Sequence, residues 1–434
     1  MQYLNILYFL IVLWFGVKFL TSDGKVLKGA LNADYKFHYS GVELFWCLTF
    51  ATSLLAFSLN FGVDLMAIRL FILEVMCLVG LGIAKNRAVM SPPLIIYCLF
   101  IAWMVFGLFY TPFVPMGIRT ILKYLYPLIL CLFASAAVRD SEVFFKSSRL
   151  ARLVALISIP FGIIPYISLL IPGVFWYGTG RAINYISMMI FSLGMFFFTN
   201  KKKENFWYTI IFLAPCFIWV LRTSILGSGV ALMAFSLIRY KAKAVPIILG
   251  LFCLGIVAIF TIPSLKEKMF YDENVTIEDF REGRISESNI DTNARAFMWE
   301  DLQKRFYEGH ELIGSGTGSV QTWMYANPSR YSGLTVPHSD FVQQKCDNGL
   351  VGLILYGAMI FFIFVDCFRT YWRNEDTAIR LCAIVAGASI IGVYATLYSD
   401  NVVNYSMCTL AMPFGFYGMM LGMRKQQQTK QISI

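Results

Sequence analysis

Long apolar runs recur along almost the whole chain, and they limit what this sequence can fold into more than any other feature. Most approach or exceed about 18 residues, the length of helix needed to cross roughly 30 Å of hydrocarbon. Of the 434 residues, 58% are hydrophobic and only 14% are charged. Backbone polar groups in hydrocarbon must be hydrogen-bonded within their own segment, so such runs predict helices and not barrel strands. We therefore expect an all-α, polytopic membrane helix bundle.

The runs predict about 12–13 transmembrane helices. The first run has no basic stretch before it and no clear small-residue cleavage site, so we expect a retained helix and not a signal peptide. Thirteen crossings place the amino terminus outside and the carboxyl terminus inside. The expected membrane helices cover residues 2–20, 42–60, 65–84, 92–111, 118–137, 152–171, 184–199, 206–221, 223–238, 245–262, 349–368, 380–398 and 405–422.

The charge of the chain is basic but scattered. The formal net charge is +10, and most Lys and Arg residues lie in short clusters between apolar runs, as in cytoplasmic loops of membrane proteins. The sequence contains no contiguous basic helix and no basic stripe interleaved with aromatic residues, so the charge does not indicate nucleic acid as a partner. We expect the chain to be embedded in a lipid bilayer.

One long polar segment interrupts the apolar pattern. It divides the chain into a membrane bundle of ten helices (1–262), an extracytoplasmic loop domain (263–348), and three last membrane helices with a cytoplasmic tail (349–434). A segment of this length is too long for a structureless connector. It contains an amphipathic helix candidate at 292–308, where Leu302 and Phe306 share a face with Met298 or Trp299. We expect a large, partly helical extracytoplasmic loop.

Four residues predicted on the outer side are candidates for chemistry. His338 lies just before the eleventh membrane helix, where a lipid-linked substrate would present its head group, although a lone histidine is also often structural. Arg181, Arg222 and Arg295 occupy outer positions that the positive-inside bias disfavours. Guanidinium groups bind phosphate oxygens through two parallel hydrogen bonds, so these arginines point to an anionic substrate. Helix capping, or pairing with outer carboxylates such as Asp340 or Asp400, is the alternative role.

The sequence predicts neither a metal nor a cofactor. Nine of the ten cysteines fall inside apolar runs, so no cysteine metal site or disulfide framework is evident. An Asp-x-Asp pair of the kind that holds a metal and a nucleotide sugar is also missing. The Gly-rich stretch LIGSGTGS at 312–319 lacks the Gly-Lys-Ser/Thr ending of a nucleotide-binding loop, and we interpret it as a turn.

The stretch from Arg295 through Gly352 resembles the C-terminal signature of the O-antigen ligase and polymerase superfamily (Wzy and WaaL proteins). An arginine is followed by an aromatic residue, then by a Gly-rich turn, a His-Ser pair, an acidic residue and Gly-Leu-Val-Gly. Arg222 before Ser224 is similar to the Ser-Arg motif of the family, in reversed order. Ser339 and Asp347 depart from the Asn and Glu that are common in the family. The signature residues are Arg295, Trp299, Gly314, Gly316, Gly318, His338, Ser339, Asp347, Gly349, Leu350, Val351 and Gly352.

The resemblance implies a glycosyltransferase that uses neither a nucleotide donor nor a metal. Members transfer a glycan from undecaprenyl pyrophosphate to a sugar hydroxyl at the outer face of the cytoplasmic membrane. Imidazole titrates near neutral pH, so His338 would be the general base, with Asp340 as a candidate to orient it. Arg181, Arg222 and Arg295 would bind the pyrophosphate and stabilise it as it leaves.

Three functions remain open from the sequence. We favour a polymerase of lipid-linked repeat units in a bacterial inner membrane, with its site facing the periplasm and a chain-length regulator as a candidate partner. A ligase that transfers finished polymer to lipid A–core uses the same donor and the same chemistry. A transporter of lipid-linked oligosaccharide would place ionisable residues deep within several helices. In this sequence only Glu74 clearly lies deep within an expected membrane helix.

Overall fold

The computed structural model describes residues 40–54, 57–59, 65–163, 174–176, 182–218, 221–271, 275–284, 289, 295–331 and 333–432. The expected first helix at 2–20 lies outside the described residues. Most of the described chain is helical, and the prediction of an all-α, polytopic membrane protein is confirmed.

The first half of the described chain contributes the following elements to the bundle. They are α2 (Gly41–Ser53), β1 (Phe57–Leu59), α3 (Leu65–Ile83), α4 (Pro92–Phe106), η1 (Gly107–Phe109), α5 (Val114–Ala137), α6 (Ser141–Ile163), β2 (Val174–Trp176), α9 (Ile186–Phe198), α10 (Lys202–Ile218), α11 (Arg222–Tyr240), η2 (Lys241–Ala244) and α12 (Val245–Thr261).

The remaining elements belong to the polar segment 263–348, which we call the outer segment, and to the last helices of the chain. They are α13 (Pro263–Met269), α14 (Ile277–Arg281), α15 (Arg295–Phe306), α16 (Ser319–Ala326), η4 (Pro328–Tyr331), α17 (Asp340–Arg373), α18 (Thr377–Thr396), η5 (Val402–Tyr405), α19 (Ser406–Thr409) and α20 (Ala411–Ile432).

Within the described residues, five helical stretches are long and apolar enough to cross a membrane. One of them comprises α11, η2 and α12 together, so the expected number of about 12–13 crossings stays a prediction. The five stretches are Pro92–Phe109, Val114–Ala137, Arg222–Thr261, Asp340–Arg373 and Thr377–Thr396.

Several expected boundaries were wrong, each for a local reason. The helix expected at 42–60 ends at Ser53, and the chain continues into β1, which pairs antiparallel with β2. The helix expected at 152–171 begins already at Ser141, because its first turns are polar and hydropathy reveals only the apolar part of a helix. Residues 340–373 share the label α17, but the helix is broken at Gly349 (φ +64°, ψ −167°), where the expected helix 349–368 begins, and only its end at Arg373 lies beyond the expected boundary.

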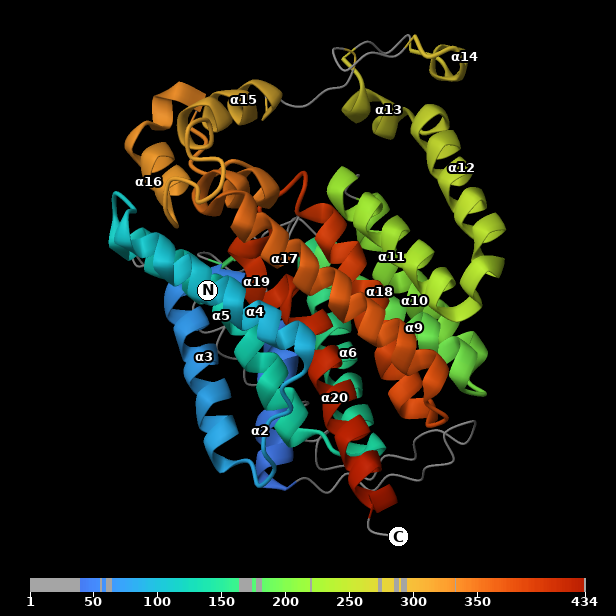
Figure 1. Ribbon diagram of the computed structural model, residues 1–434. Helices are drawn as coiled ribbons and strands as arrows, with labels where there is room; N and C mark the ends of the chain where they lie inside the picture. Colours follow the sequence, from blue (N-terminus) through green and yellow to red (C-terminus); the bar gives the residue numbers. More distant parts are fainter. Residues whose placement is uncertain are drawn as a thin grey trace.

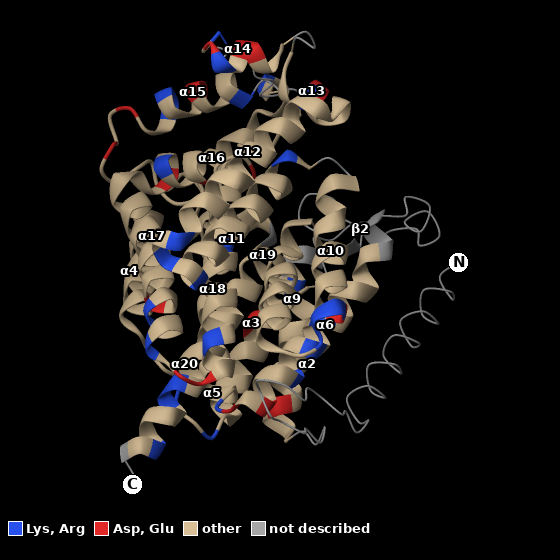
Figure 2. Ribbon diagram, turned by 90° about the vertical axis from the view of Figure 1, so that its right-hand side faces the viewer, with Lys and Arg blue, Asp and Glu red and all other residues tan. Residues whose placement is uncertain are grey.

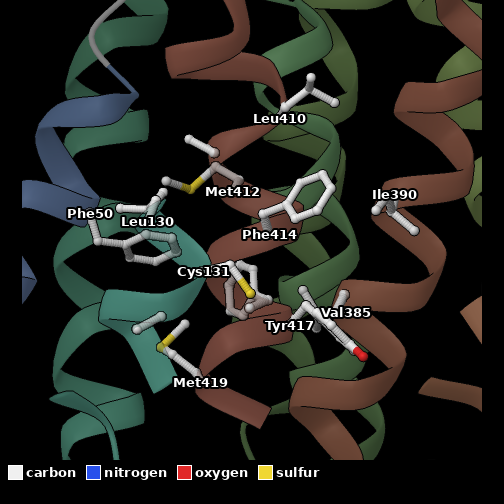
Figure 3. Packing of buried hydrophobic residues seen from close by; sticks show 14 of the residues in the cluster. Phe50, Leu130, Cys131, Val385, Ile390, Leu410, Met412, Phe414, Tyr417 and Met419 are labelled. Carbon is white, nitrogen blue, oxygen red and sulfur yellow. The ribbon is translucent and has the colours of Figure 1, made fainter. Parts of the chain in front are cut away.

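Helices α18 and α20 lie at the centre of the bundle. Helix α18 contacts α9, α11, α17 and α20, while α20 also packs along α5. Figure 3 shows buried side chains of α5, α18 and α20 filling one layer between these helices. A Cβ atom at Gly418 would lie 2.2 Å from the carbonyl oxygen of Cys131, so glycine lets α20 approach α5 closely. Small residues serve this purpose in membrane bundles.

Helices α13 to α16 gather at one end of the bundle, and the carboxyl terminus lies at the opposite end (Figure 1). Charged segments mark both ends, around α13–α15 and along the last part of α20 (Figure 2). Because α11 packs antiparallel to α18, the first residue of α11 and the last residues of α18 lie at the end that carries α15 and α16. We call this end the outer end.

Candidate active site

His338 stands at the outer end, immediately before α17. Its backbone adopts φ +51°, a left-handed conformation that is uncommon for a residue with a side chain. The next residue, Ser339, caps α17 by accepting a hydrogen bond from the amide of Val342 at 3.3 Å. The imidazole is 27% exposed. Strained backbone of this kind is often found at functional sites, and among the described non-Gly residues only Lys241 shares a positive φ. The catalytic role of His338 stays a prediction.

Asp400 is the carboxylate beside this imidazole. Its Oδ1 lies 3.8 Å from Nδ1 of His338, and the Asp400 side chain is 11% exposed. The same oxygen accepts a hydrogen bond from the amide of Asn401 at 2.8 Å, which holds the carboxylate in place. With Nδ1 directed at Asp400, Nε2 is the imidazole nitrogen left to take a proton. Hydrogen bonds of catalytic pairs often shorten only when substrate is bound.

Asp340, the sequence-based candidate to orient His338, has a different role. Its carboxylate is buried and accepts hydrogen bonds from the side chain of Asn401 at 3.2 Å and from the amide of Val403 at 3.0 Å. Asp340 therefore fastens the loop that carries Asp400 to the first turn of α17. From the sequence, Asp400 is expected only as a partner for outer arginines, because 62 residues separate it from His338 and no local pattern joins the two.

Helix α15 covers the His338 segment through two hydrogen bonds. Nε1 of Trp299 donates to the carbonyl of Pro337 at 2.6 Å, one residue before His338. Nη1 of Arg295 donates to the carbonyl of Ser399 at 2.8 Å, one residue before Asp400. The amphipathic helix expected at 292–308 is thus observed at 295–306, with Met298 and Leu302 buried as predicted. Helix α15 thus connects the segment before α17, which carries the imidazole, with the turn after α18, which carries the carboxylate.

The three candidate arginines have different placements. Arg295 lies beside the Asp400 turn, as just described. Arg222 is the first residue of α11, and five residues further on Gly227 packs against Thr396 and the carbonyl of Gly392, near the end of α18. Arg222 therefore shares the outer end with His338. Arg181 lies outside the described residues.

A further outer cation reaches the same loop from α5. Nζ of Lys123 donates to Oδ1 of Asn404 in η5 at 2.5 Å, and the lysine is only 8% exposed. Like the candidate arginines, Lys123 is a basic residue that the sequence places on the outer side, at the start of the expected helix 118–137, against the positive-inside bias. Its position between α5 and η5 adds positive charge close to the loop that carries Asp400.

The Gly-rich stretch 312–319 packs against α17 where that helix bends. The carboxylate of Asp347 accepts hydrogen bonds from the amides of Gly318 at 3.1 Å and Val320 at 2.9 Å. The amides of Ser315 and Gly316 donate to the carbonyls of Cys346 and Asp347, both at 2.9 Å. These amides are occupied by the protein itself, so the stretch is a structural junction and not an anion cradle. This agrees with the turn interpreted from the sequence.

Asp301 stabilises the outer surface of α15. Arg330 contacts it through two hydrogen bonds of 2.9 Å, Arg305 donates a third at 3.2 Å, and the Tyr331 hydroxyl is also bonded to it. Arg330 above all, with Tyr331 and Arg305, holds the pKa of Asp301 well below its usual range. Among the described residues, no group of three or more His, Cys, Asp or Glu side chains is placed to hold a metal ion. The expectation that no metal takes part stays a prediction.

The fold and this outer site define a multi-pass helical membrane protein with a folded polar segment above its bundle. Residues 207–357 match the model of a family described as O-antigen ligase. The matched region contains Arg222, Arg295 and His338, and it supports the resemblance to the O-antigen ligase and polymerase superfamily. It therefore supports an enzyme of surface-glycan assembly. No curated protein matches the chain.

Proposed function

We propose that this protein polymerises oligosaccharide repeat units carried on undecaprenyl pyrophosphate. The observation that carries the proposal is the His338–Asp400 pair at the outer end, 3.8 Å apart and joined by α15. An imidazole backed by a carboxylate suits the removal of a proton from a sugar hydroxyl near neutral pH. The matched family works on surface glycans, which supplies the class of substrate.

The proposed reaction is a displacement at the reducing-end carbon of the donor glycan. The acceptor hydroxyl oxygen forms a bond to this carbon while Nε2 of His338 takes the hydroxyl proton. The bond from the same carbon to the pyrophosphate oxygen breaks, and undecaprenyl pyrophosphate leaves with the electron pair. Asp400 stabilises the imidazolium that forms, as a buried carboxylate does in other His-based sites. No nucleotide donor is required.

Arginines are proposed to stabilise the leaving pyrophosphate. Arg222 and Arg295 both belong to the outer end, and Arg181 is proposed from the sequence alone. Fixed cations aimed at the developing charge lower the barrier without reorganising during the reaction. The proposal places the site on the periplasmic side of a bacterial inner membrane, with a chain-length regulator as a candidate partner.

A ligase is the second candidate, and one observation favours it: the matching family is described as O-antigen ligase. It would use the same donor and the same base but transfer the glycan to lipid A–core. We favour the polymerase because the loops of the chain offer no evident extra site for so large an acceptor. A transporter is less well supported, because Asp400 and His338 lie at the outer end instead of along a path through the bundle.

Reconstitution separates these functions. Purified protein in lipid bilayers would receive only undecaprenyl-pyrophosphate-linked repeat units, and the products would be resolved by size. A ladder of longer lipid-linked glycans that disappears in His338→Ala is the expected result. Transfer only after lipid A–core is added would make the protein a ligase. Inertness in both assays would contradict both enzymes and favour transport. Chain growth left intact by His338→Ala at normal expression would overturn the assignment of the base.

A further inference from the structure

An exposed tyrosine lies in the turn that carries Asp400, the carboxylate beside the proposed base. Tyr398 lies in the turn between α18 and η5, two residues before Asp400, and is 61% exposed. Its ring meets the ring of Trp299 edge-on, with centroids 5.8 Å apart and planes at 66°. The centroid of the same ring is 6.4 Å from that of Phe341 in the first turn of α17. A large aromatic ring is thus presented to the surroundings at the outer end.

The position of this ring is fixed relative to His338. Trp299 is held by its hydrogen bond to Pro337, and the residue after Tyr398 is held by Arg295. The residue before it, Leu397, accepts a hydrogen bond of 2.9 Å from the amide of Asp340. The turn is therefore tied to α15 and to α17 at once. A ligand that rested on Tyr398 would be held at a defined distance from the imidazole.

The chemistry of the two rings selects the kind of ligand. Trp299 and Tyr398 carry no charge, so they do not suit a pyrophosphate, which needs cations. Rigid, amphipathic aromatic surfaces suit a ligand with one apolar face and polar edges. A pyranose has such a C–H face, and its hydroxyl groups lie around the edge. Stacked on Tyr398, a sugar would keep its hydroxyls free to approach His338.

We propose that Trp299 and Tyr398 form a stacking platform for the acceptor sugar. This inference rests on the proposed function and extends it by naming the residues that select the acceptor. The platform fixes which ring is presented to His338, whereas the arginines act on the donor pyrophosphate. The alternative partner for an exposed tyrosine at the outer end is the lipid head-group region, where Tyr is enriched in membrane proteins.

The test uses Tyr398→Ala and Tyr398→Phe in the reconstituted full-length protein. The matched control is Tyr271→Ala, because Tyr271 is 62% exposed and lies in the outer segment just after α13. With lipid-linked glycan as the varied substrate, Tyr398→Ala should raise KM about fivefold and change kcat less than about twofold, since stacking on one ring is worth on the order of 1 kcal/mol. Tyr398→Phe and Tyr271→Ala should resemble the wild type.

A binding measurement gives a readout without turnover. The probe is the oligosaccharide released by mild acid from the source organism's lipid-linked repeat unit, added without donor. Saturation-transfer NMR should show contact between protein and sugar ring in the wild type and in Tyr398→Phe. The signal should be lost in Tyr398→Ala and kept in Tyr271→Ala.

The outcomes separate this inference from the proposed function. If the wild type builds a ladder but Tyr398→Ala changes neither KM nor the NMR signal, the platform is wrong and the polymerase stands. If Tyr398→Ala lowers only thermal stability in bilayers, the tyrosine is a membrane-interface anchor and the platform is overturned. If the wild type builds no product, the proposed function fails, and the NMR result alone decides whether sugar binds at Tyr398.

Discussion

At the scale of single residues, the site depends on a carboxylate that lies far from the histidine in sequence. Asp400 faces Nδ1 of His338 at 3.8 Å, and buried Asp340 holds the loop that carries it. We therefore propose distinct functions for the two aspartates: Asp400 positions the base, and Asp340 anchors the backbone. Substitutions at the two positions should accordingly fail in different ways.

Replacing Asp400 by Asn should slow the chemical step without weakening substrate binding. The amide keeps the size of the side chain but removes the charge that supports the imidazolium, and general-base catalysis contributes about 10²–10⁴-fold in rate. We expect kcat to fall about 100-fold while KM changes less than about threefold, measured in the reconstituted assay. Asp279→Asn in α14 is the control. An unchanged kcat in Asp400→Asn would remove the aspartate from the mechanism.

Lysine should not replace the arginines of the outer end. Guanidinium groups present a planar fork of donors that matches phosphate oxygens, whereas an ammonium group is a point charge. We expect Arg222→Lys and Arg295→Lys to lose about tenfold or more of kcat/KM, equivalent to about 1.4 kcal/mol. Arg284→Lys, in an exposed ion pair with Asp279 and Glu282, should retain full activity. Full activity in the two site variants would contradict bidentate binding of pyrophosphate.

At the scale of elements, the Gly-rich stretch and α15 hold the outer segment onto the bundle. Gly314, Gly316 and Gly318 all have positive φ, and they lie against backbone atoms of α17, of the η1–Thr111 region and of the first turn of α5, respectively. Hydrogen bonds of the stretch go to Cys346, Asp347 and Asn348 in α17, and others go to Met104 in α4 and Phe306 in α15. The signature that resembles the superfamily is therefore largely a packing motif that positions α15 above His338.

Gly316→Ala should destabilise the protein more than a glycine change in open space. At Gly316, φ is +99° and an added Cβ would lie 2.7 Å from Cα of Thr111. Gly283 has φ +67° with nothing within 4 Å of an added Cβ, so Gly283→Ala isolates the backbone cost of about 1–2 kcal/mol. Thermal unfolding in detergent should show a clearly larger decrease for Gly316→Ala. Equal decreases would mean that the contact with Thr111 can relax.

Asp301→Asn should loosen α15 in a pH-dependent way. The pKa of Asp301 is lowered in the folded protein by Arg330, Tyr331 and Arg305, so its contribution to stability is complete above the unfolded pKa, about 3.9. That contribution is lost as pH falls from there toward the lower folded pKa. Hydrogen exchange in α15 should be faster in the variant at pH 7, and the difference from the wild type should shrink below about pH 4. A difference that persisted at low pH would exclude the ionised carboxylate as its cause.

At the scale of the whole molecule, the two ends of the bundle carry different parts of the chain and differ in their proposed roles. The outer end carries α13 to α16 and the proposed site, and the opposite end carries the carboxyl terminus (Figure 1). Between them, α12 stands beside the bundle, and within the part of the chain that the structure describes none of its side chains is buried. Such an apolar helix is suited to contact with lipid.

The orientation can be checked by labelling with a membrane-impermeant maleimide. Tyr271→Cys in the outer segment should be labelled in intact cells, whereas Gln428→Cys near the end of α20 should react only after permeabilisation. The wild type, which contains only the native cysteines, is the control and should remain unlabelled. Cys253 is exposed on α12, but we expect lipid to shield it from the reagent. The reverse pattern would invert the topology and place His338 on the cytoplasmic side, away from the proposed donor.

By itself, the sequence determined the class of fold, because an apolar run of transmembrane length has almost no alternative to a helix in hydrocarbon. It also indicated α15, through the period of Met298, Leu302 and Phe306, and His338 as a candidate base. Only the tertiary structure could pair His338 with Asp400, bring Lys123 to Asn404 and place Tyr398 against Trp299. These contacts join residues from segments that are far apart in the sequence, and no local pattern records which helix ends and turns meet. Their arrangement follows from how α5, α15, α17 and α18 pack together, and that packing decides the site.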